Sequence, residues 1–279
     1  MTPSQASVGR LIVCPTPIGN LEDVTLRVLA ALANVDLIAC EDTRHTRVLL
    51  DHHGITARLV SFHEHNERAR ARELVGRIQA GSVIALVSDA GTPLVSDPGF
   101  ALVKECLVEG LPIEVLPGSS AVLTALVASG LPTERWCFVG FLPRKAGERG
   151  QLLKCAEETL VAFESPRRLA ATLAQLAALD PERPLAVCRE LTKVHEEVRR
   201  GSAAQLADYY RVSPARGEVV IVVGAATPGE GRRPEALSAA RELVDAGVRV
   251  RTAAAVVGKL TGVGANELYR ELTGSGAKP

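Results

Sequence analysis

Val83-Ile84-Ala85-Leu86-Val87, followed at once by Ser88-Asp89-Ala90-Gly91-Thr92-Pro93-Leu94-Val95-Ser96-Asp97-Pro98-Gly99, is the stretch that decides the fold of this chain. The first five residues form an apolar run that predicts a buried strand, and residues 100–108 predict a helix. The loop between them therefore lies at the carboxyl end of a parallel strand, where open α/β sheets bind ligands. Its small residues leave backbone groups accessible, which favours a ligand loop over a plain connection.

Strands and helices alternate on both sides of this loop, which predicts an α/β fold with a mostly parallel first sheet. In the first part of the chain we expect strands over residues 11–14, 35–39, 59–62, 83–87 and 113–116, and helices over 23–34, 46–53, 66–80, 100–108 and 121–129. In a second α/β block we expect strands over 137–141, 161–163, 185–189 and 219–223, and helices over 151–157, 166–179 and 202–210.

Breaks in this alternation predict the domain organisation. Gly130-Leu131-Pro132-Thr133 separates the two blocks, and residues 224–233 are rich in glycine and proline, as a linker is. We therefore expect an N-terminal α/β domain, a C-terminal α/β domain and a small helical C-terminal region, over residues 10–130, 135–226 and 234–273.

The composition is typical of a globular protein with a sizeable core. Of the 279 residues, 47% are hydrophobic and only 3% are aromatic, so the core must consist mainly of Ala, Val and Leu. The formal net charge is zero, whereas a protein that grips long duplex nucleic acid usually carries a basic excess. Any contact with nucleic acid must therefore be local, or must depend on the shape of the target.

The six cysteines are scattered and form no Cys-x-x-Cys pair, which predicts reduced thiols in a cytoplasmic protein. The first residues lack the apolar core of a signal peptide. No run approaches the roughly 18 to 20 apolar residues of a membrane span, so we expect no membrane partner.

Several familiar motifs are missing. No Gly-x-Gly-x-x-Gly follows the first strand and no Gly-x-x-x-x-Gly-Lys-Ser/Thr occurs, which argues against a dinucleotide-binding domain, a P-loop NTPase and the commonest methyltransferase fold. His52-His53 and His63-Glu64-His65 lack the spacing of metal ligands, so we interpret them as surface or capping histidines. We expect no metal site.

Two polar segments follow expected strands and are candidates for chemistry. Glu41-Asp42-Thr43-Arg44-His45 offers acids, a hydroxyl, a cation and a histidine, more groups than a helix cap (with Thr43 as the capping residue) needs. Arg189-Glu190-Leu191-Thr192-Lys193 has the same position in the second block, where its acid–base pair forms a structural ion pair or orients a substrate hydroxyl. The arginines of the helix over 66–80 are better explained as an ion-paired solvated face.

Nine segments in order along the chain fit one family, over about residues 10–225. They are Thr16-Pro17-Ile18-Gly19-Asn20-Leu21, Glu41 to Thr46, Phe62 to Glu67, Ala85 to Pro93 with Ser96 to Gly99, Pro117 to Ala121, Gly140 to Pro143, Phe163 to Arg168, Arg189 to Lys193 and Gly217 to Val220. The chain resembles the ribosomal RNA small subunit methyltransferase I family, of the tetrapyrrole methylase superfamily. Asp89-Ala90-Gly91 replaces the Gly-Asp-Pro of porphyrin and corrin methylases, which disfavours a corrin substrate.

The resemblance implies S-adenosyl-L-methionine as the methyl donor, bound in a cleft between two α/β domains of tetrapyrrole methylase type. It implies 2′-O-methylation of a cytidine ribose in 16S rRNA, at the decoding centre of the small ribosomal subunit, by a homodimer. Carried over by position, the cofactor contacts fall on Pro17, Ile18, Asp89, Ala90, Gly91, Thr92, Pro93, Ser120, Ala121, Phe141, Leu142 and Arg189.

Methyl transfer to a ribose hydroxyl needs alignment and removal of a proton, and no metal. As candidate bases we name Glu190 and Asp42, with Lys193 and Arg44 as orienting or phosphate-binding cations. We expect the loop-borne cations Arg144, Lys145, Arg149 and Arg167 to contact rRNA phosphates. A precorrin-type methyltransferase and a non-catalytic ribosome-binding module remain the alternatives.

Overall fold

The structure is a computed structural model that describes residues 9–226 and 233–274. Most of the expected linker over residues 224–233 lies outside the described residues. The chain divides into two compact units, one comprising residues 1–125 and 188–197 and the other residues 126–187 and 198–279. Within the described residues no helix is both long and apolar enough to cross a membrane.

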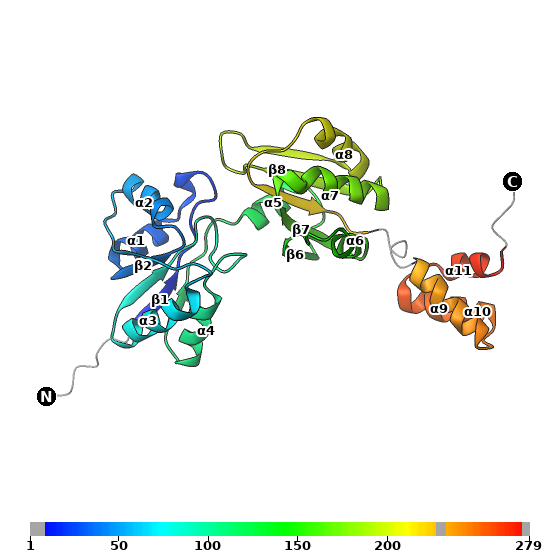
Figure 1. Cartoon of the computed structure of the whole chain (residues 1–279), viewed down its shortest axis with the longest axis horizontal. Coiled ribbons are helices and arrows are strands. Elements are labelled where there is room, and N and C mark those ends of the chain that lie inside the picture. The colour runs from blue at the N-terminus through cyan, green and yellow to red at the C-terminus, as the bar shows by residue number, and fades with distance from the viewer. Residues whose placement is uncertain (1–8, 227–232, 275–279) are drawn as a thin grey trace. The chain divides into compact units, whose positions relative to one another are not determined.

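The first unit contains a five-stranded sheet in the order β3-β2-β4-β1-β5 (Figure 1). The pairs β1–β4, β1–β5, β2–β3 and β2–β4 are all parallel, as the alternation of strands and helices predicts. The strands are β1 (Arg10–Val13), β2 (Leu37–Cys40), β3 (Leu59–Ser61), β4 (Val83–Leu86) and β5 (Ile113–Val115). The helices are α1 (Leu26–Asn34), α2 (Thr43–His52), α3 (Glu67–Gln79), α4 (Phe100–Val108) and α5 (Ala121–Ser129), with a 3₁₀ turn at Leu21–Asp23.

Helices cover both faces of this sheet. Successive side chains of a strand point to opposite faces, so Ile12 packs with α1 and α2 while Leu11 and Val13 pack with α3 and α4. Figure 1 shows the two pairs of helices on the two sides of the strands. Because both faces are buried, the strands are apolar along their whole length, as Val83-Ile84-Ala85-Leu86 is.

The second unit contains a sheet in the order β6-β7-β10-β8-β9, in which β7 pairs with β6 in parallel and with β10 antiparallel. Three helices cover one of its faces. The strands are β6 (Trp136–Phe141), β7 (Thr159–Glu164), β8 (Pro184–Arg189), β9 (Glu197–Ser202) and β10 (Val219–Val223), and the helices are α6 (Ala146–Lys154), α7 (Pro166–Leu179) and α8 (Ala203–Val212). The expected helix over 151–157 thus begins earlier, and β9 was not expected from the sequence.

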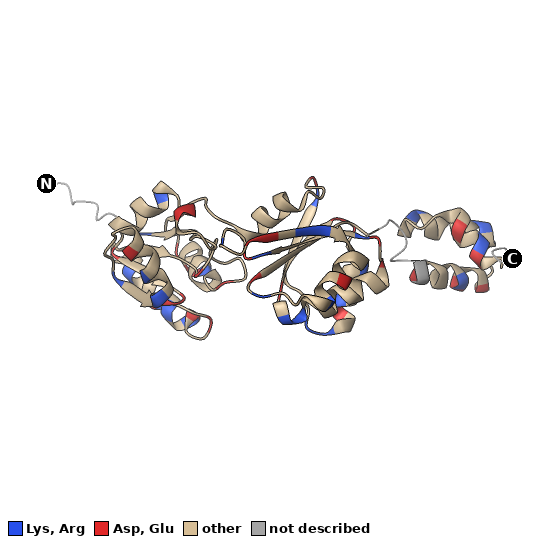
Figure 2. Cartoon of the chain, turned by 90° about the horizontal axis from the view of Figure 1, so that it is seen from above, with Lys and Arg blue, Asp and Glu red and all other residues tan. Residues whose placement is uncertain are grey.

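Three further helices follow in the C-terminal part of the chain, α9 (Arg233–Asp245), α10 (Val250–Thr261) and α11 (Ala265–Leu272). They share a small core of alanine, valine and leucine that includes Ala240, Val257 and Leu268. Gly258 lets α10 approach the start of α11, since a Cβ there would lie 2.8 Å from the carbonyl oxygen of Val263. Blue and red residues are interspersed on the ribbon of each part of the chain, in line with the zero net charge (Figure 2).

A buried arginine ties the second unit together. Arg183, which is 2% exposed, donates to the carbonyl oxygens of Gly224 (2.8 Å), Leu153 (2.5 Å) and Ala156 (3.3 Å). It thereby joins the end of α6 to the segment that follows β10. Burial lowers the pKa of its guanidinium, and three carbonyl oxygens compensate for the lost hydration.

Replacing Arg183 by methionine should therefore destabilise the protein by about 2–4 kcal/mol, because three buried carbonyls lose their donor. Urea denaturation followed by circular dichroism measures the change. The matched control is Arg211→Met, since Arg211 is exposed and its ion pair with Asp208 spans 3.6 Å, which predicts a change below about 0.5 kcal/mol. Equal stabilities of the two variants would contradict the structural role of Arg183.

Candidate functional site

The neighbouring strands β1 and β4 send the chain to opposite faces of the first sheet. The helix that follows β1 is α1, on one face, and the helix that follows β4 is α4, on the other. Open α/β sheets have a crevice at the carboxyl ends of two such strands, and ligands bind there. Residues 14–20 and 87–99 border this crevice.

Backbone hydrogen bonds join the two loops across the crevice. Thr16 N–H donates to Gly91 O (2.8 Å), and Gly91 N–H donates to Thr16 O (2.9 Å). The Thr16 hydroxyl also donates to Ser88 O (3.0 Å). Gly91 has a φ of +79°, a conformation that glycine adopts without steric cost. A third loop is attached by the Thr92 hydroxyl, which donates to Ser119 O (3.1 Å).

Most of the expected cofactor residues therefore gather at adjacent strand ends. Residues 17 and 18 follow β1, residues 89–93 follow β4, and residues 120 and 121 follow β5. The Ser120 hydroxyl accepts from Leu123 N–H (3.4 Å) at the start of α5. The structure thus brings together Pro17, Ile18, Asp89, Ala90, Gly91, Thr92, Pro93, Ser120 and Ala121 at one edge of the sheet.

Asp89 connects the loop after β4 to the loop after β2. Its Oδ1 accepts from Asp42 N–H (3.0 Å), and its Oδ2 lies 3.3 Å from His45 Nδ1. Asp42, and not Thr43 as expected, caps α2 by accepting from Arg44 N–H (2.8 Å). The Arg44 guanidinium binds the same carboxylate, with an Nη2–Oδ2 distance of 2.6 Å, and holds the pKa of Asp42 well below its usual range. A carboxylate held in this way is a poor base.

A second acidic group lies in the loop after β4. The pKa of Asp97 is raised to about 6, mainly by burial and in addition by the charges of Glu41 and Asp89, while a hydrogen bond from Ser88 opposes the shift. Burial and the charge of Asp89 also raise the pKa of Glu41. Like charges near one another disfavour ionisation, so Asp97 and Glu41 hold their protons more tightly than isolated carboxyl groups do. We interpret these two groups as shaping the loop.

The segment after β8 is a strained polar turn. Glu190 and Thr192 have φ values of +51° and +66°, which are unfavourable for residues with a side chain, and most of all for a β-branched threonine. Lys193 Nζ lies 3.0 Å from Glu190 Oε1, and Arg189 Nε lies 2.6 Å from Glu197 Oε2. The Thr192 hydroxyl oxygen is buried without a hydrogen-bond partner. Backbone strain and an unsatisfied hydroxyl are typical of functional sites.

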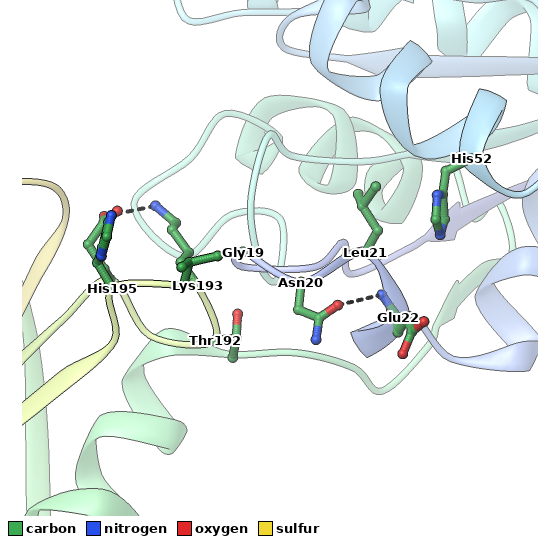
Figure 3. Close-up of a pocket in the computed structure, with 10 residues that line it drawn as sticks. Gly19, Asn20, Leu21, Glu22, His52, Thr192, Lys193 and His195 are labelled. Carbon is green, nitrogen blue, oxygen red and sulfur yellow. Dashed lines mark hydrogen bonds and ion pairs between the residues drawn. The ribbon is translucent and has the colours of Figure 1, made fainter.

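Gly19 brings the loop after β1 against this turn. A Cβ at Gly19 would lie 2.5 Å from Lys193 Cγ, 2.7 Å from Thr192 Oγ1 and 2.9 Å from Leu191 O. Beside the contact lies a cavity of about 610 Å³, all of whose lining residues belong to the first unit (Figure 3). Its lining is Gly19, Asn20, Leu21, Glu22, His52, Glu190, Thr192, Lys193, Val194 and His195.

The residues of the second unit that are expected to contact the methyl donor or rRNA phosphates differ in their exposure. Phe141 is 61% exposed, and its ring centroid lies 5.4 Å from that of Phe163. Leu142 is buried and donates its N–H to Phe163 O (3.1 Å). Arg144 and Arg167 are exposed, as is Lys145, whose Nζ lies 2.9 Å from Glu148 Oε1.

Arg149 differs from the other expected phosphate contacts. It is 7% exposed, and its Nε donates to Gln175 Oε1 (2.8 Å), which fixes α6 to α7. The sequence places it beside Lys145, but the helical turn directs it inward. This buried position supports a structural role for Arg149 in place of the expected contact with phosphate.

Sequence reasoning missed the residues that complete the cavity. Glu22 and His195 lie outside the segments that the sequence analysis singles out. Asn20 belongs to the first family segment but has no role assigned there, and His52 is interpreted as a surface or capping histidine. Residues 9–226 and 233–274 contain no group of three or more metal-ligating side chains. The strained turn and the close approach at Gly19 are the signals that identify the cavity, and both are visible only in three dimensions.

Comparison with known proteins gives the family. Residues 10–207 match the model of the tetrapyrrole (corrin/porphyrin) methylases. The chain is 47% identical over 269 residues to "Ribosomal RNA small subunit methyltransferase I" of Mesorhizobium japonicum, an alignment that covers 94% of this chain and 90% of the relative. It is 43% identical to the protein of the same name from Escherichia coli O157:H7, with 95% of this chain and 94% of the relative covered.

A solved structure supports the fold. It is uroporphyrin-III C-methyl transferase from Thermus thermophilus complexed with S-adenyl homocysteine, with a TM-score of 0.53 and 22% identity over 77% of this chain and 97% of that one. The sequence identities to the two proteins named ribosomal RNA small subunit methyltransferase I are about twice the identity to this solved structure. Their alignments also cover more of the chain than residues 10–207, which the family model matches. The chain therefore belongs to the tetrapyrrole methylase family and, within it, to the ribosomal RNA small subunit methyltransferase I family.

Proposed function

We propose that this protein transfers a methyl group from S-adenosyl-L-methionine to the ribose 2′-hydroxyl of a cytidine in 16S rRNA, at the decoding centre of the small ribosomal subunit. Membership of the family supports methylation of rRNA with this donor. The observation that carries the proposal is the position of the loop after β1. Its Thr16 borders the strand-end crevice, and its Gly19 borders the cavity. One short loop thus separates a place for the donor from a place for the acceptor.

The crevice fits a nucleoside-type methyl donor. The loop after β4 contains the small residues Ala90, Gly91 and Pro93, which leave its backbone groups accessible. Ile18 packs close by, since a Cβ on Gly91 would lie 3.4 Å from Ile18 Cγ2. The solved relative that holds S-adenyl homocysteine shares this fold. When bound, S-adenosyl-L-methionine supplies a methyl group on a positively charged sulfur that leaves as a neutral thioether. The strand-end loops hold and orient the donor.

The protein's task is to align the ribose hydroxyl and accept its proton. The 2′-oxygen forms a bond to the methyl carbon as the carbon–sulfur bond breaks, and the hydroxyl proton passes to a carboxylate. Both candidate carboxylates are ion-paired, Glu190 with Lys193 and Asp42 with Arg44, but only Glu190 is among the residues that line the cavity, so it suits this role better. Lys193 orients the Glu190 carboxylate, and Arg44 serves as an exposed cation for phosphate.

The remaining contacts complete the proposal. Arg144, Lys145 and Arg167 are exposed cations that can meet rRNA phosphates. Phe141, Leu142 and Arg189 complete the set of residues proposed for the donor. The enzyme works as a cytoplasmic homodimer, without a metal.

The direct test is to incubate the protein with methyl-labelled S-adenosyl-L-methionine and either free 16S rRNA or assembled small subunits, and to map the modified nucleotide. We expect a single 2′-O-methylated cytidine. The zero net charge favours the assembled particle as the substrate over naked RNA. Label in a porphyrin or corrin alone would overturn the proposal, and transfer to no acceptor would favour a ribosome-binding module.

Glu190→Gln should lower the rate of methyl transfer by about 10²–10⁴-fold, because the amide keeps the shape of the side chain but accepts no proton. Binding of the donor, measured by calorimetry, should change little. Asp42→Asn should lower the rate of methyl transfer less than Glu190→Gln does in the same assay. Glu73→Gln is the control, since Glu73 lies in a surface ion pair with Arg70 and Arg77. A larger loss for Asp42→Asn would reassign the base.

A side chain at φ +79° costs about 1–2 kcal/mol, and in Gly91→Ala the loop relieves this strain by opening the bridge to Thr16. Binding of the donor must then restore the bridge, so its affinity should fall by about 5–30-fold. Gly54→Ala is a matched control, with a φ of +67°, no atom within 4 Å of the new Cβ and a position at the end of α2. Both variants should lose similar stability. If both also bound the donor equally well, the crevice would not be its site.

The raised pKa of Asp97 predicts that the stability of the folded protein depends on pH. Its pKa of about 6 in the folded protein exceeds the ordinary 3.8, so the folded state loses stability as pH rises from about 4 to 6. Asp97→Asn should therefore raise the free energy of unfolding at pH 7.5 and have little effect at pH 4. Urea denaturation at the two pH values measures this difference. An equal effect at both would contradict the raised pKa.

A further inference from the structure

Part of the wall of the cavity beside Gly19 has no role in the proposed methyl transfer. Glu190 and Lys193 lie on one side of the cavity, while Asn20, Glu22 and His52 line it from the loop after β1 and from α2. We propose that this wall holds the base of the target nucleotide, and that Glu22 and Asn20 select a base with an exocyclic amino group. The inference rests on the proposed function and names how its substrate is chosen.

The size of the cavity suits one nucleotide. Its volume of about 610 Å³ lies within the roughly 300–1,000 Å³ typical of small-molecule sites. A pocket of this size can take a nucleotide that has left its stack, as occurs in enzymes that modify bases within a duplex. Leu21 and the His52 ring supply apolar and aromatic surface for the base.

Asn20 and Glu22 are held in place by a local hydrogen bond. Asn20 Oδ1 accepts from Glu22 N–H (3.1 Å) and caps the 3₁₀ turn Leu21–Asp23. This contact occupies the amide oxygen and leaves the amide Nδ2 as the donor that Asn20 presents. Figure 3 shows the Asn20 amide oxygen joined to the backbone nitrogen of Glu22, with both side chains extending from the same short turn. The wall therefore places a donor beside an acceptor.

That pair matches the edge of cytosine. A carboxylate only accepts hydrogen bonds, so the Glu22 carboxylate favours an amino group such as N4 of cytosine, while an amide N–H favours the adjacent ring nitrogen. Uracil presents a carbonyl oxygen and a ring N–H at these positions, which would place acceptor against acceptor and donor against donor. Unpaired polar groups of this kind reject the wrong substrate strongly.

The part of the cavity lined by the turn after β8 carries a cation for the phosphate of the same nucleotide. Lys193 and His195 line it, and the Lys193 ammonium is held 3.0 Å from Glu190 Oε1. The Glu22 carboxylate at the base end and the Lys193 ammonium in the turn orient a nucleotide with its phosphate toward Lys193. The ribose then lies between them, near Glu190.

The test compares cytidine and uridine as targets. Wild-type protein is given small subunits whose target nucleotide is cytidine or uridine, and methyl transfer is measured for each. We expect wild type to favour cytidine by at least about 100-fold. Glu22→Gln, whose amide can donate to O4 of uracil, should lower the rate of methyl transfer to cytidine by about tenfold or more. It should also reduce the ratio of the cytidine rate to the uridine rate below about tenfold. Glu73→Gln should keep the wild-type ratio.

A binding measurement separates this inference from the proposed function. Cytidine 5′-monophosphate and uridine 5′-monophosphate are titrated into wild type and Glu22→Gln, and binding is followed by changes in the NMR signals of Asn20 and Leu21. Preference of wild type for the cytidine nucleotide, lost in Glu22→Gln, supports the base site even if no rRNA is methylated. An unchanged preference in the variant, or none in wild type, overturns it.

Discussion

The two backbone hydrogen bonds between Thr16 and Gly91 are the contact on which the site depends. They join the loops of β1 and β4 where the chain turns to opposite faces of the sheet. Buried loops need partners for their backbone groups, and here each loop satisfies the other. The exchange requires the positive φ of Gly91, so the loop uses glycine where a larger residue would be strained. The crevice is thereby rigid before any ligand binds.

The carboxylates around the crevice divide into structural and chemical groups. Asp42 caps α2 and is bound by Arg44, while Asp89 accepts the backbone N–H of Asp42. The Arg44 contacts hold the pKa of Asp42 below its usual range, which makes Asp42 a stable anchor and a weak base. Glu190 is also ion-paired, with Lys193, but it lines a cavity, on a turn held at a positive φ. This position in the cavity is why we propose the turn, and not the strand ends, for proton removal.

The sequence predicts the first sheet well because its strands are apolar runs between turn residues, as Val83–Leu86 shows. It does not predict β9, because Glu-Val-Arg-Arg-Gly-Ser has a single apolar residue and its pairing with β8 comes from the tertiary fold. It places the start of α6 too late, because Gly147 and Gly150 weaken the helical pattern. The strand-end loops were predictable from motif and position, whereas the cavity depends on Gly19 meeting residues 191–193, far along the chain.

The close packing at Gly19 has a consequence for how the two substrates are coupled. A Cβ there would collide with Lys193 Cγ and with Leu191 O, so the loop and the turn can approach only with glycine between them. Thr16, three residues earlier, is bonded to Gly91 across the crevice. Methyl transfer requires donor and acceptor atoms at near-contact distance, and misplacement by about 1 Å costs about a hundredfold in rate. If the crevice holds the donor and the cavity the acceptor, as we propose, a short loop fixed at both ends meets that requirement, because a shift in its position would move both sites together.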